Sequence, residues 1–230
     1  ILFGCGKNEK EMIMNTNEKV NLLEKLSNNK KFSIKQLLVL QDLSKDEDVM
    51  IRSMVASVLV NVVNQDTKSV LLSLAHDHEA LVRVEAYDSL SVFSFEDVEN
   101  FLLKSIYTET NDLARSYAIL SWSDVVKTLQ HVTANNISLL ITKKQVEKSA
   151  DCLLSYCYGL YLFGEEGALN EMLLYLYHED YHLRCAALNL LRDIMNSTNK
   201  IIIRDAVTKL LISESAVSVK DRATRFLNDI

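Results

Sequence analysis

The stretch His76–Leu90, "HDHEALVRVEAYDSL", contains a pattern that returns along the whole chain. Its second half has an apolar residue, an arginine, then an alanine three positions and a leucine seven positions after the arginine. Related copies end at Leu59, Trp122, Leu191 and Leu227. A motif that returns at a nearly constant spacing of this length is typical of an array of stacked helical units.

The arginine of this motif serves as the anchor from which we count positions. The anchors of the six predicted units are Arg52, Arg83, Arg115, Glu147, Arg184 and Lys220. They are separated by 31, 32, 32, 37 and 36 residues. Positions −1, +3, +7 and +10 are apolar in nearly every unit and fall within about one quadrant of a helix, as in the buried stripe of an amphipathic helix. The recurrent alanine at +3 favours a close helix–helix contact, since a larger side chain would overpack it.

The composition favours helix throughout the chain. The 230 residues include no proline and only 5 glycines, whereas average usage is roughly 5% and 7%. A second apolar run precedes each anchor-bearing helix, and Ser33, Asp77 and Asp180 in the short polar turns are expected N-caps. We therefore predict an all-α fold, an α-solenoid of stacked antiparallel helix pairs. It forms one domain over residues 14–230, with Thr16–Leu26 as a capping helix.

Three of the copies, "EDVMIRSMVASVL", "HEALVRVEAYDSL" and "EDYHLRCAALNLL", carry a family resemblance. They resemble HEAT repeats, especially the short HEAT-like repeats of phycobilisome lyases, and the resemblance covers residues 33–230. It implies a ladder between neighbouring units, built from the anchor arginine and an acidic residue four positions before it. The matching residues are Asp48 with Arg52, Glu79 with Arg83, Asn111 or Asp112 with Arg115, and Asp180 with Arg184.

Two units depart from this pattern. The fourth has Lys143 before Glu147, and the sixth has Ala216 before Lys220. The turn proline usual in the family is absent from every unit. These departures, together with the longer spacings, predict less even stacking after the third unit.

Charge and cysteine content limit the classes of function. The net charge of −6 argues against a nucleic-acid or anionic-membrane binder, whose affinity comes mostly from lysine and arginine. The four cysteines, Cys5, Cys152, Cys157 and Cys185, form no CxxC pair and indicate free thiols in a reducing compartment. No apolar run reaches the ~18 residues of a membrane-spanning helix. We expect a cytoplasmic protein.

The leader, residues 1–13, allows several interpretations. The opening "ILFGCG" could be the end of a lipoprotein signal, which would anchor the protein through a lipid on Cys5. A true start at Met12 or Met14 would instead make the leader translated upstream sequence or an added segment. An ordinary structural N-terminus is the third interpretation.

Histidine pairs are the first place where chemistry could lie. His76 and His78 form one pair and His178 and His182 the other, beside carboxylates that could complete a metal site. Both pairs fall on predicted turns three units apart, so we interpret them as polar turn residues and expect no metal.

Trp122 and Asp124 raise the alternative of an enzyme that acts on DNA. HEAT-like DNA glycosylases use tryptophan and aspartate side chains on a basic inner surface. Here Trp122 takes the +7 core position and the chain is acidic, which favours a structural tryptophan. The sequence has no P-loop, GxGxxG, HExxH or nucleophile triad, so we predict neither catalysis nor a cofactor.

Two function classes follow. The first is a non-catalytic scaffold that binds a partner protein on its concave face, a class that includes regulatory and immunity-type proteins. The alternative is a DNA glycosylase or lyase-type enzyme that acts on a ligand in the concave groove. Positions +1, +5, +8 and +12 of each second helix are expected to face the groove and to make it locally positive for an acidic partner. The predicted partner-binding residues are Lys127, Lys148, Arg192 and Arg225, with Tyr156 as an anchor near the rim.

Overall fold

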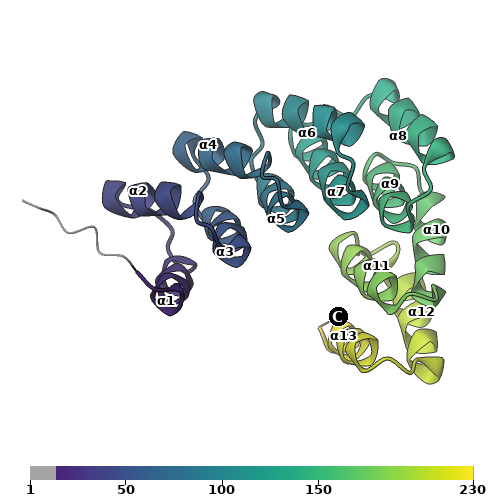
Figure 1. Ribbon diagram of the computed structural model, residues 1–230. Helices are drawn as coiled ribbons and strands as arrows, with labels where there is room; N and C mark the ends of the chain where they lie inside the picture. The colour runs from purple at the N-terminus through teal and green to yellow at the C-terminus, as the bar shows by residue number, and fades with distance from the viewer. Residues whose placement is uncertain (1–13, 230) are drawn as a thin grey trace, which may run out of the picture.

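The protein forms an arch of paired helices, which we describe from a computed structural model of residues 14–229 (Figure 1). Thirteen α-helices and one turn of 3-10 helix include 73% of these residues, and none of them lies in a β-strand. The predicted all-α solenoid is confirmed. The first helices of the six units are α2 (Ile34–Leu43), α4 (Gln65–Leu74), α6 (Glu96–Thr108), α8 (Ala134–Val146), α10 (Ala168–Leu174, extended by the 3-10 turn Tyr175–Tyr177) and α12 (Lys200–Ser213). The second helices are α3 (Val49–Leu59), α5 (Ala80–Leu90), α7 (Asp112–Thr128), α9 (Ala150–Leu162), α11 (Tyr181–Asp193) and α13 (Val217–Asn228).

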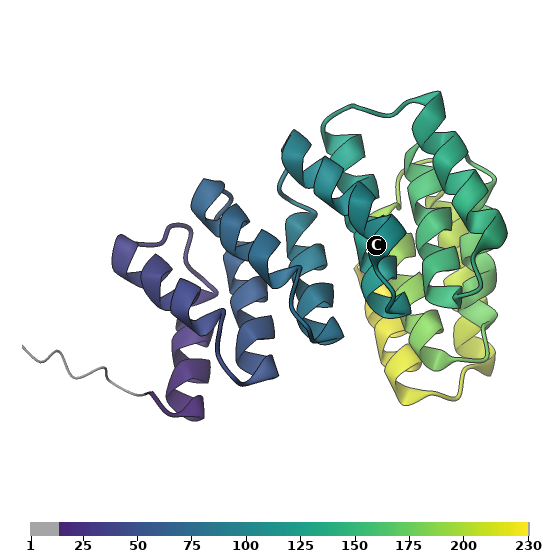
Figure 2. The same ribbon diagram turned by 45° about the horizontal axis from the view of Figure 1, so that its top comes forward.

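The helices form two layers. The second helices follow one another along the inner side of the arch, and the first helices cover the outer side (Figure 1). Helix α1 (Thr16–Leu26) packs against α3 at the start of the inner layer, as expected for a capping helix. The outer row runs along the top of Figure 1 as far as α6 and then turns down through α8, α10 and α12. Figure 2 shows the same change as an open N-terminal half beside a closely gathered C-terminal half.

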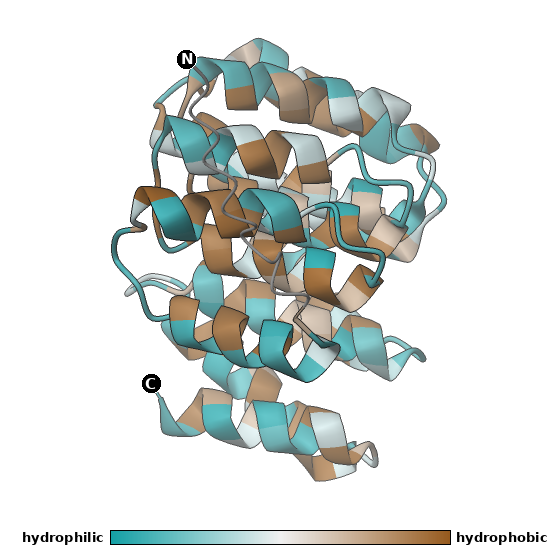
Figure 3. Cartoon of the chain, turned by 60° about the vertical axis from the view of Figure 1, so that its left-hand side comes forward, coloured by the Kyte–Doolittle hydropathy of each residue, from teal (hydrophilic) through white to brown (hydrophobic). Residues whose placement is uncertain are grey.

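The predicted core positions are buried. In the second unit, Val82, Ala86, Leu90 and Phe93 are inaccessible to solvent. Each large apolar side chain buried in this way contributes roughly 1.5–3 kcal/mol of transfer free energy. In Figure 3, apolar colouring follows the faces at which helices meet, while hydrophilic colouring predominates in the turns.

The fourth unit has a different register from the one predicted. Elsewhere the anchor is the fourth residue of the second helix, and in α9 that residue is Leu153, not Glu147. Glu147 lies in the turn before the helix, whose N-cap is Ser149. The residues at −1, +3, +7 and +10 from Leu153 are all buried, namely Cys152, Tyr156, Leu160 and Phe163. The alternative frame was misleading because "VEKSADCLL" also spaces its apolar residues at a helical period.

The predicted N-caps are confirmed at two of three positions. Ser33 forms a capping box with Gln36, and Asp180 accepts a hydrogen bond from the backbone of His182. Asp77 is not a cap, because α5 begins after Glu79. The interpretations of residues 1–13, including a lipidated Cys5, concern residues outside the described part of the chain. Among the described helices, none has the length and apolar composition needed to cross a membrane.

Candidate functional site

A row of ion pairs links successive units on the side of the turns. In each turn, the residue six positions before the anchor accepts a hydrogen bond from the backbone of the residue two positions later. The carboxylates at this position are Asp46, Asp77, Glu109, Glu147 and Glu214. Because this bond fixes the side chain in the turn, the carboxylate points toward the anchor of the preceding unit.

Each anchor arginine binds the carboxylate of the following unit through two nitrogen atoms. The Nε–O distance is 2.7 Å in the Arg52–Asp77, Arg83–Glu109 and Arg184–Glu214 pairs, and 3.3 Å between Arg115 and Glu147. Lys19 of α1 donates to Asp46 at 2.6 Å, which extends the row to the capping helix. We call this row the ladder and each pair a rung. Bidentate, partly buried pairs of this kind fix geometry as well as adding energy.

The acid that binds Arg52, Arg83 and Arg184 differs from the predicted one, whereas Arg115 does bind the predicted Asp112, at 2.7 Å, in addition to Glu147. Asp48 and Asp180, four positions before their anchors, cap their own helices instead, and Glu79 lies outside the rung that Arg83 forms with Glu109. An N-cap side chain turns back toward the amides of its own helix and so cannot reach the preceding unit. The expectation that an acid of a neighbouring unit holds Arg83 is confirmed.

At one junction the rung is replaced by two residues that form no ion pair with each other. At the junction of the fourth and fifth units, Leu153 takes the arginine position and His178 takes the carboxylate position. Nδ1 of His178 accepts the turn hydrogen bond from Asp180 at 3.0 Å, and its ring stacks on Tyr175 at 5.8 Å between centroids. The two replacements occur together, so neither an arginine nor a carboxylate is left without its partner.

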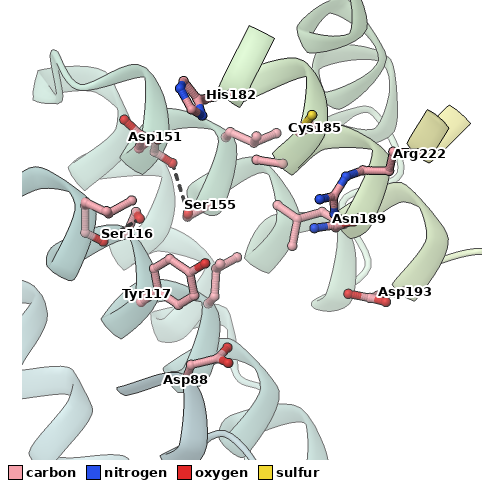
Figure 4. A pocket seen from close by; sticks show the side chains of 15 residues that line it. Asp88, Ser116, Tyr117, Asp151, Ser155, His182, Cys185, Asn189, Asp193 and Arg222 are labelled. Carbon is pink, nitrogen blue, oxygen red and sulfur yellow. Dashed lines mark hydrogen bonds between the residues drawn. The ribbon is translucent and has the colours of Figure 1, made fainter. Parts of the chain in front are cut away.

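The inner side of the arch contains a cavity of about 430 Å³. We call it the groove. Its lining comes from α5, α7, α9, α11 and α13, which the bend of the array brings together (Figures 1 and 4). The apolar part of the lining is Leu113, Leu120, Leu154, Ala186 and Leu190. The polar part is Asp88, Ser116, Tyr117, Asp151, Ser155, His182, Cys185, Asn189, Asp193 and Arg222.

The surroundings of the groove raise the pKa values of its carboxyl groups. Burial raises the pKa of Asp88, and the charge of Asp193 raises it further. Burial also raises the pKa of Asp151 and of Asp193. Arg222, the guanidinium in the groove, donates to the side chain of Asn189 and not to one of these carboxylates. The groove therefore carries an excess of negative charge.

A fourth aspartate adjoins this set. Asp124 occupies position +9 of α7, which corresponds to Asp193 on α11. It accepts a hydrogen bond from the hydroxyl of Tyr158 at 2.7 Å. Burial, reinforced by the charges of Asp193 and Asp88, raises the pKa of Asp124 to about 6, although the bond from Tyr158 acts in the opposite direction.

The predicted basic residues do not form the groove. Lys127, Lys148, Arg192 and Arg225 are exposed and none lines the cavity, and Arg225 pairs with Asp221 on its own helix. Tyr156 is 1% exposed and so cannot act as an anchor at the rim. The predictions for Lys148 and Tyr156 were wrong because they used the wrong register of the fourth unit. That register put Lys148 on the inner face and kept Tyr156 out of the core positions.

The face that lines the groove is also rotated from the predicted one. Positions +1 and +5 do line it in the third and fifth units, at Ser116, Leu120, Cys185 and Asn189. Positions +8 and +12 turn away, and −2, +2 and +9 take their place with Asp151, Tyr117, Arg222 and Asp193. The helices pack on neighbours within their own layer as well as on the outer layer, so the open side is not directly opposite the core stripe. The recurrence of aspartate at +9 of two helices was the signal available in the sequence.

The tryptophan, histidine and cysteine side chains considered above as possible reactive groups make packing or hydrogen-bond contacts instead. Trp122 is fully buried and packs edge-on against Phe163, with ring centroids 5.7 Å apart. His76 lies against Phe101, and His178 takes the carboxylate position at the junction that lacks a rung. Within residues 14–229, no three metal-ligating side chains come together. The buried thiols Cys152 and Cys157 have pKa values raised to about 11, mainly by burial, which makes them poor nucleophiles.

The fold, the ladder and the groove together define an α-solenoid of stacked helix pairs. Residues 37–122 match the family model of HEAT repeats, so the predicted resemblance to HEAT repeats is confirmed over these residues. A search of the curated proteins gave no match.

Solved structures share the fold over nearly the whole chain. One is the complex of CpcE and CpcF of phycocyanin lyase from Nostoc sp. PCC7120, with 13% sequence identity and a TM-score of 0.60. This similarity covers 100% of the present chain and 99% of the other. Another is YibA of E. coli, with 17% identity and a TM-score of 0.51, over 98% of this chain and 77% of that one. At these identities the likeness concerns the fold.

Proposed function

We propose that the protein is a non-catalytic solenoid that binds part of a partner protein in the groove. The observation that supports this function is the cavity itself, which the inner helices of five successive units line together. Its lining combines apolar side chains with polar groups, the composition of a site that recognises another molecule. Concave inner surfaces are also where solenoids commonly bind their partners.

The enzyme alternatives find less support. A DNA glycosylase needs a basic surface for the phosphates, whereas the groove is acidic and Trp122 is inside the core. A lyase-type reaction at Cys185 needs a base that activates the thiol. Among the described hydrogen bonds, none joins that sulfur atom to His182 or to a carboxylate.

Cys185 offers a direct test of partner binding. It lines the groove and is partly exposed, whereas Cys152 and Cys157 are buried. A Cys5→Ser protein carrying a photocrosslinker on Cys185 should crosslink to a partner in cells of the source organism. The matched control is Cys5→Ser, Cys185→Ser, Lys104→Cys, which places the same crosslinker on the exposed side of the outer helix α6. Equal crosslinking from both positions, or none from Cys185, would contradict the proposal.

A further inference from the structure

The groove gathers negative charge without neutralising it. Four aspartates, Asp88, Asp124, Asp151 and Asp193, line or adjoin it, against the single guanidinium of Arg222. None of the four takes part in an ion pair among the described residues. The ladder shows the opposite arrangement, since its carboxylates bind an arginine or a lysine. The aspartates of the groove thus remain available to a cation from outside.

Concentrating these carboxylates has a free-energy cost. Charges of like sign in a partly buried site repel each other, and burial disfavours the ionised form of each. Burial is the main cause of the raised pKa values of Asp88, Asp124 and Asp193, and the charge of Asp193 adds repulsion at Asp88 and at Asp124. A bound cation would remove the repulsion and gain an attraction in the same place, so the groove favours positive ligands.

The shape and the apolar lining indicate what kind of cation fits. The ring of Tyr117 lies within the groove, with Asp88 on one side and Asp151 on the other, and Arg222 and Asn189 stand across from it (Figure 4). Leu120, Leu154 and Leu190 surround these groups with apolar surface. An arginine or lysine side chain matches such a site, because its stem packs on apolar groups while its head meets carboxylates or an aromatic face.

We propose that the partner presents a basic segment to the groove, with an arginine or lysine side chain over Tyr117 between Asp88, Asp151 and Asp193. This inference rests on the proposed function and adds the chemistry of the partner. It replaces the acidic partner expected from the sequence, because the groove has the opposite charge to the one predicted.

The test uses the full chain and a hexa-arginine peptide as probe. Titration calorimetry at low salt should show binding to the wild type, and Asp88→Asn with Asp193→Asn should weaken it at least tenfold. The matched control is Asp66→Asn with Asp205→Asn, which removes two exposed carboxylates from the outer helices α4 and α12 and changes the net charge equally. This control should bind the peptide like the wild type.

Several outcomes would overturn the inference. Absence of peptide binding, or equal weakening in both double variants, would show that the groove does not select a basic segment. Equally tight binding of spermine would assign the groove to free polyamines. The groove variant loses like-charge repulsion and should melt no lower than the wild type, so weaker binding cannot be explained by unfolding. Crosslinking from Cys185 that excess hexa-arginine leaves unchanged would overturn this inference while the proposed function stands.

Discussion

Arg83 binds two turns at once. Its Nη1 donates to the carbonyl oxygen of Asp77 in its own unit at 2.8 Å, while Nε and Nη2 bind the carboxylate of Glu109 in the next unit at 2.7 and 2.8 Å. The carboxylate of Glu109 in turn accepts the backbone N–H of Asn111. A single pair thus fixes the turn of one unit against the turn of its neighbour, and the same arrangement recurs at Arg52 and Arg184.

Glu109→Gln should lower the free energy of unfolding by about 1–2 kcal/mol, because a charged bidentate pair becomes a weaker neutral contact. Although burial acts to raise it, the bonds from Arg83 hold the pKa of Glu109 below its usual value. The stabilisation is therefore present above the ordinary glutamate pKa and is lost as the pH falls through the lowered one. Urea denaturation at pH 7 measures the effect. Glu79→Gln, the acid that the sequence predicted, is the control and should leave stability unchanged.

Leu153→Arg combined with His178→Glu should create the ion pair that the junction of the fourth and fifth units lacks. Leu153→Arg and His178→Glu alone each introduce a charge without a partner, so each should be neutral or destabilising. Together they should show a favourable coupling of about 1 kcal/mol in a double-mutant cycle, as expected for a partly exposed pair. Additive effects would mean that α9 and α11 are not placed for the contact seen at the other junctions.

Ala86→Leu and Ala187→Leu should each cost about 1–3 kcal/mol by overpacking. Both alanines are fully buried at position +3 of their helices. Thermal unfolding measures the loss, and Ser69→Leu, at an exposed position of α4, serves as the control for adding the same side chain. Unchanged melting temperatures for both alanine variants would contradict the register of the units.

Asp124→Asn should stabilise the protein at neutral pH and not at pH 4. The folded state raises the pKa of Asp124 from 3.8 to about 6, so the folded protein holds this proton more tightly than the unfolded chain. Stability therefore falls as the pH rises from about 4 to 6, and above this range the penalty approaches about 3 kcal/mol at most. Asparagine removes the charge and keeps an acceptor for Tyr158. A gain of equal size at pH 4 and pH 7.5, measured by thermal unfolding, would exclude a charge effect.

The sequence predicted the architecture because the core stripe depends only on local periodicity. Val82, Ala86 and Leu90 follow a helical period that burial then confirms. The sequence predicted correctly that ion pairs link neighbouring units. The predicted acid lay four positions before the anchor and the observed one lies six positions before it, because backbone hydrogen bonds decide where a turn side chain points. The groove required the curvature of the whole array, which brings Asp88 and Arg222 to one cavity although they are four units apart. Local periodicity contains no information on that curvature.

The exchange at Leu153 and His178 has a consequence for how this array could grow or be rearranged. A unit with an arginine anchor and a carboxylate in its turn can follow any similar unit, because each brings both halves of a compatible junction. Duplication, deletion or exchange of such units keeps every join matched. The fourth unit has Leu153 at the arginine position, and the fifth has His178 at the carboxylate position. If an ordinary unit followed the fourth, its carboxylate would lack an arginine; if an ordinary unit preceded the fifth, its arginine would lack a carboxylate. This one junction therefore disfavours exchange of the fourth or the fifth unit for a unit that carries the usual arginine or carboxylate.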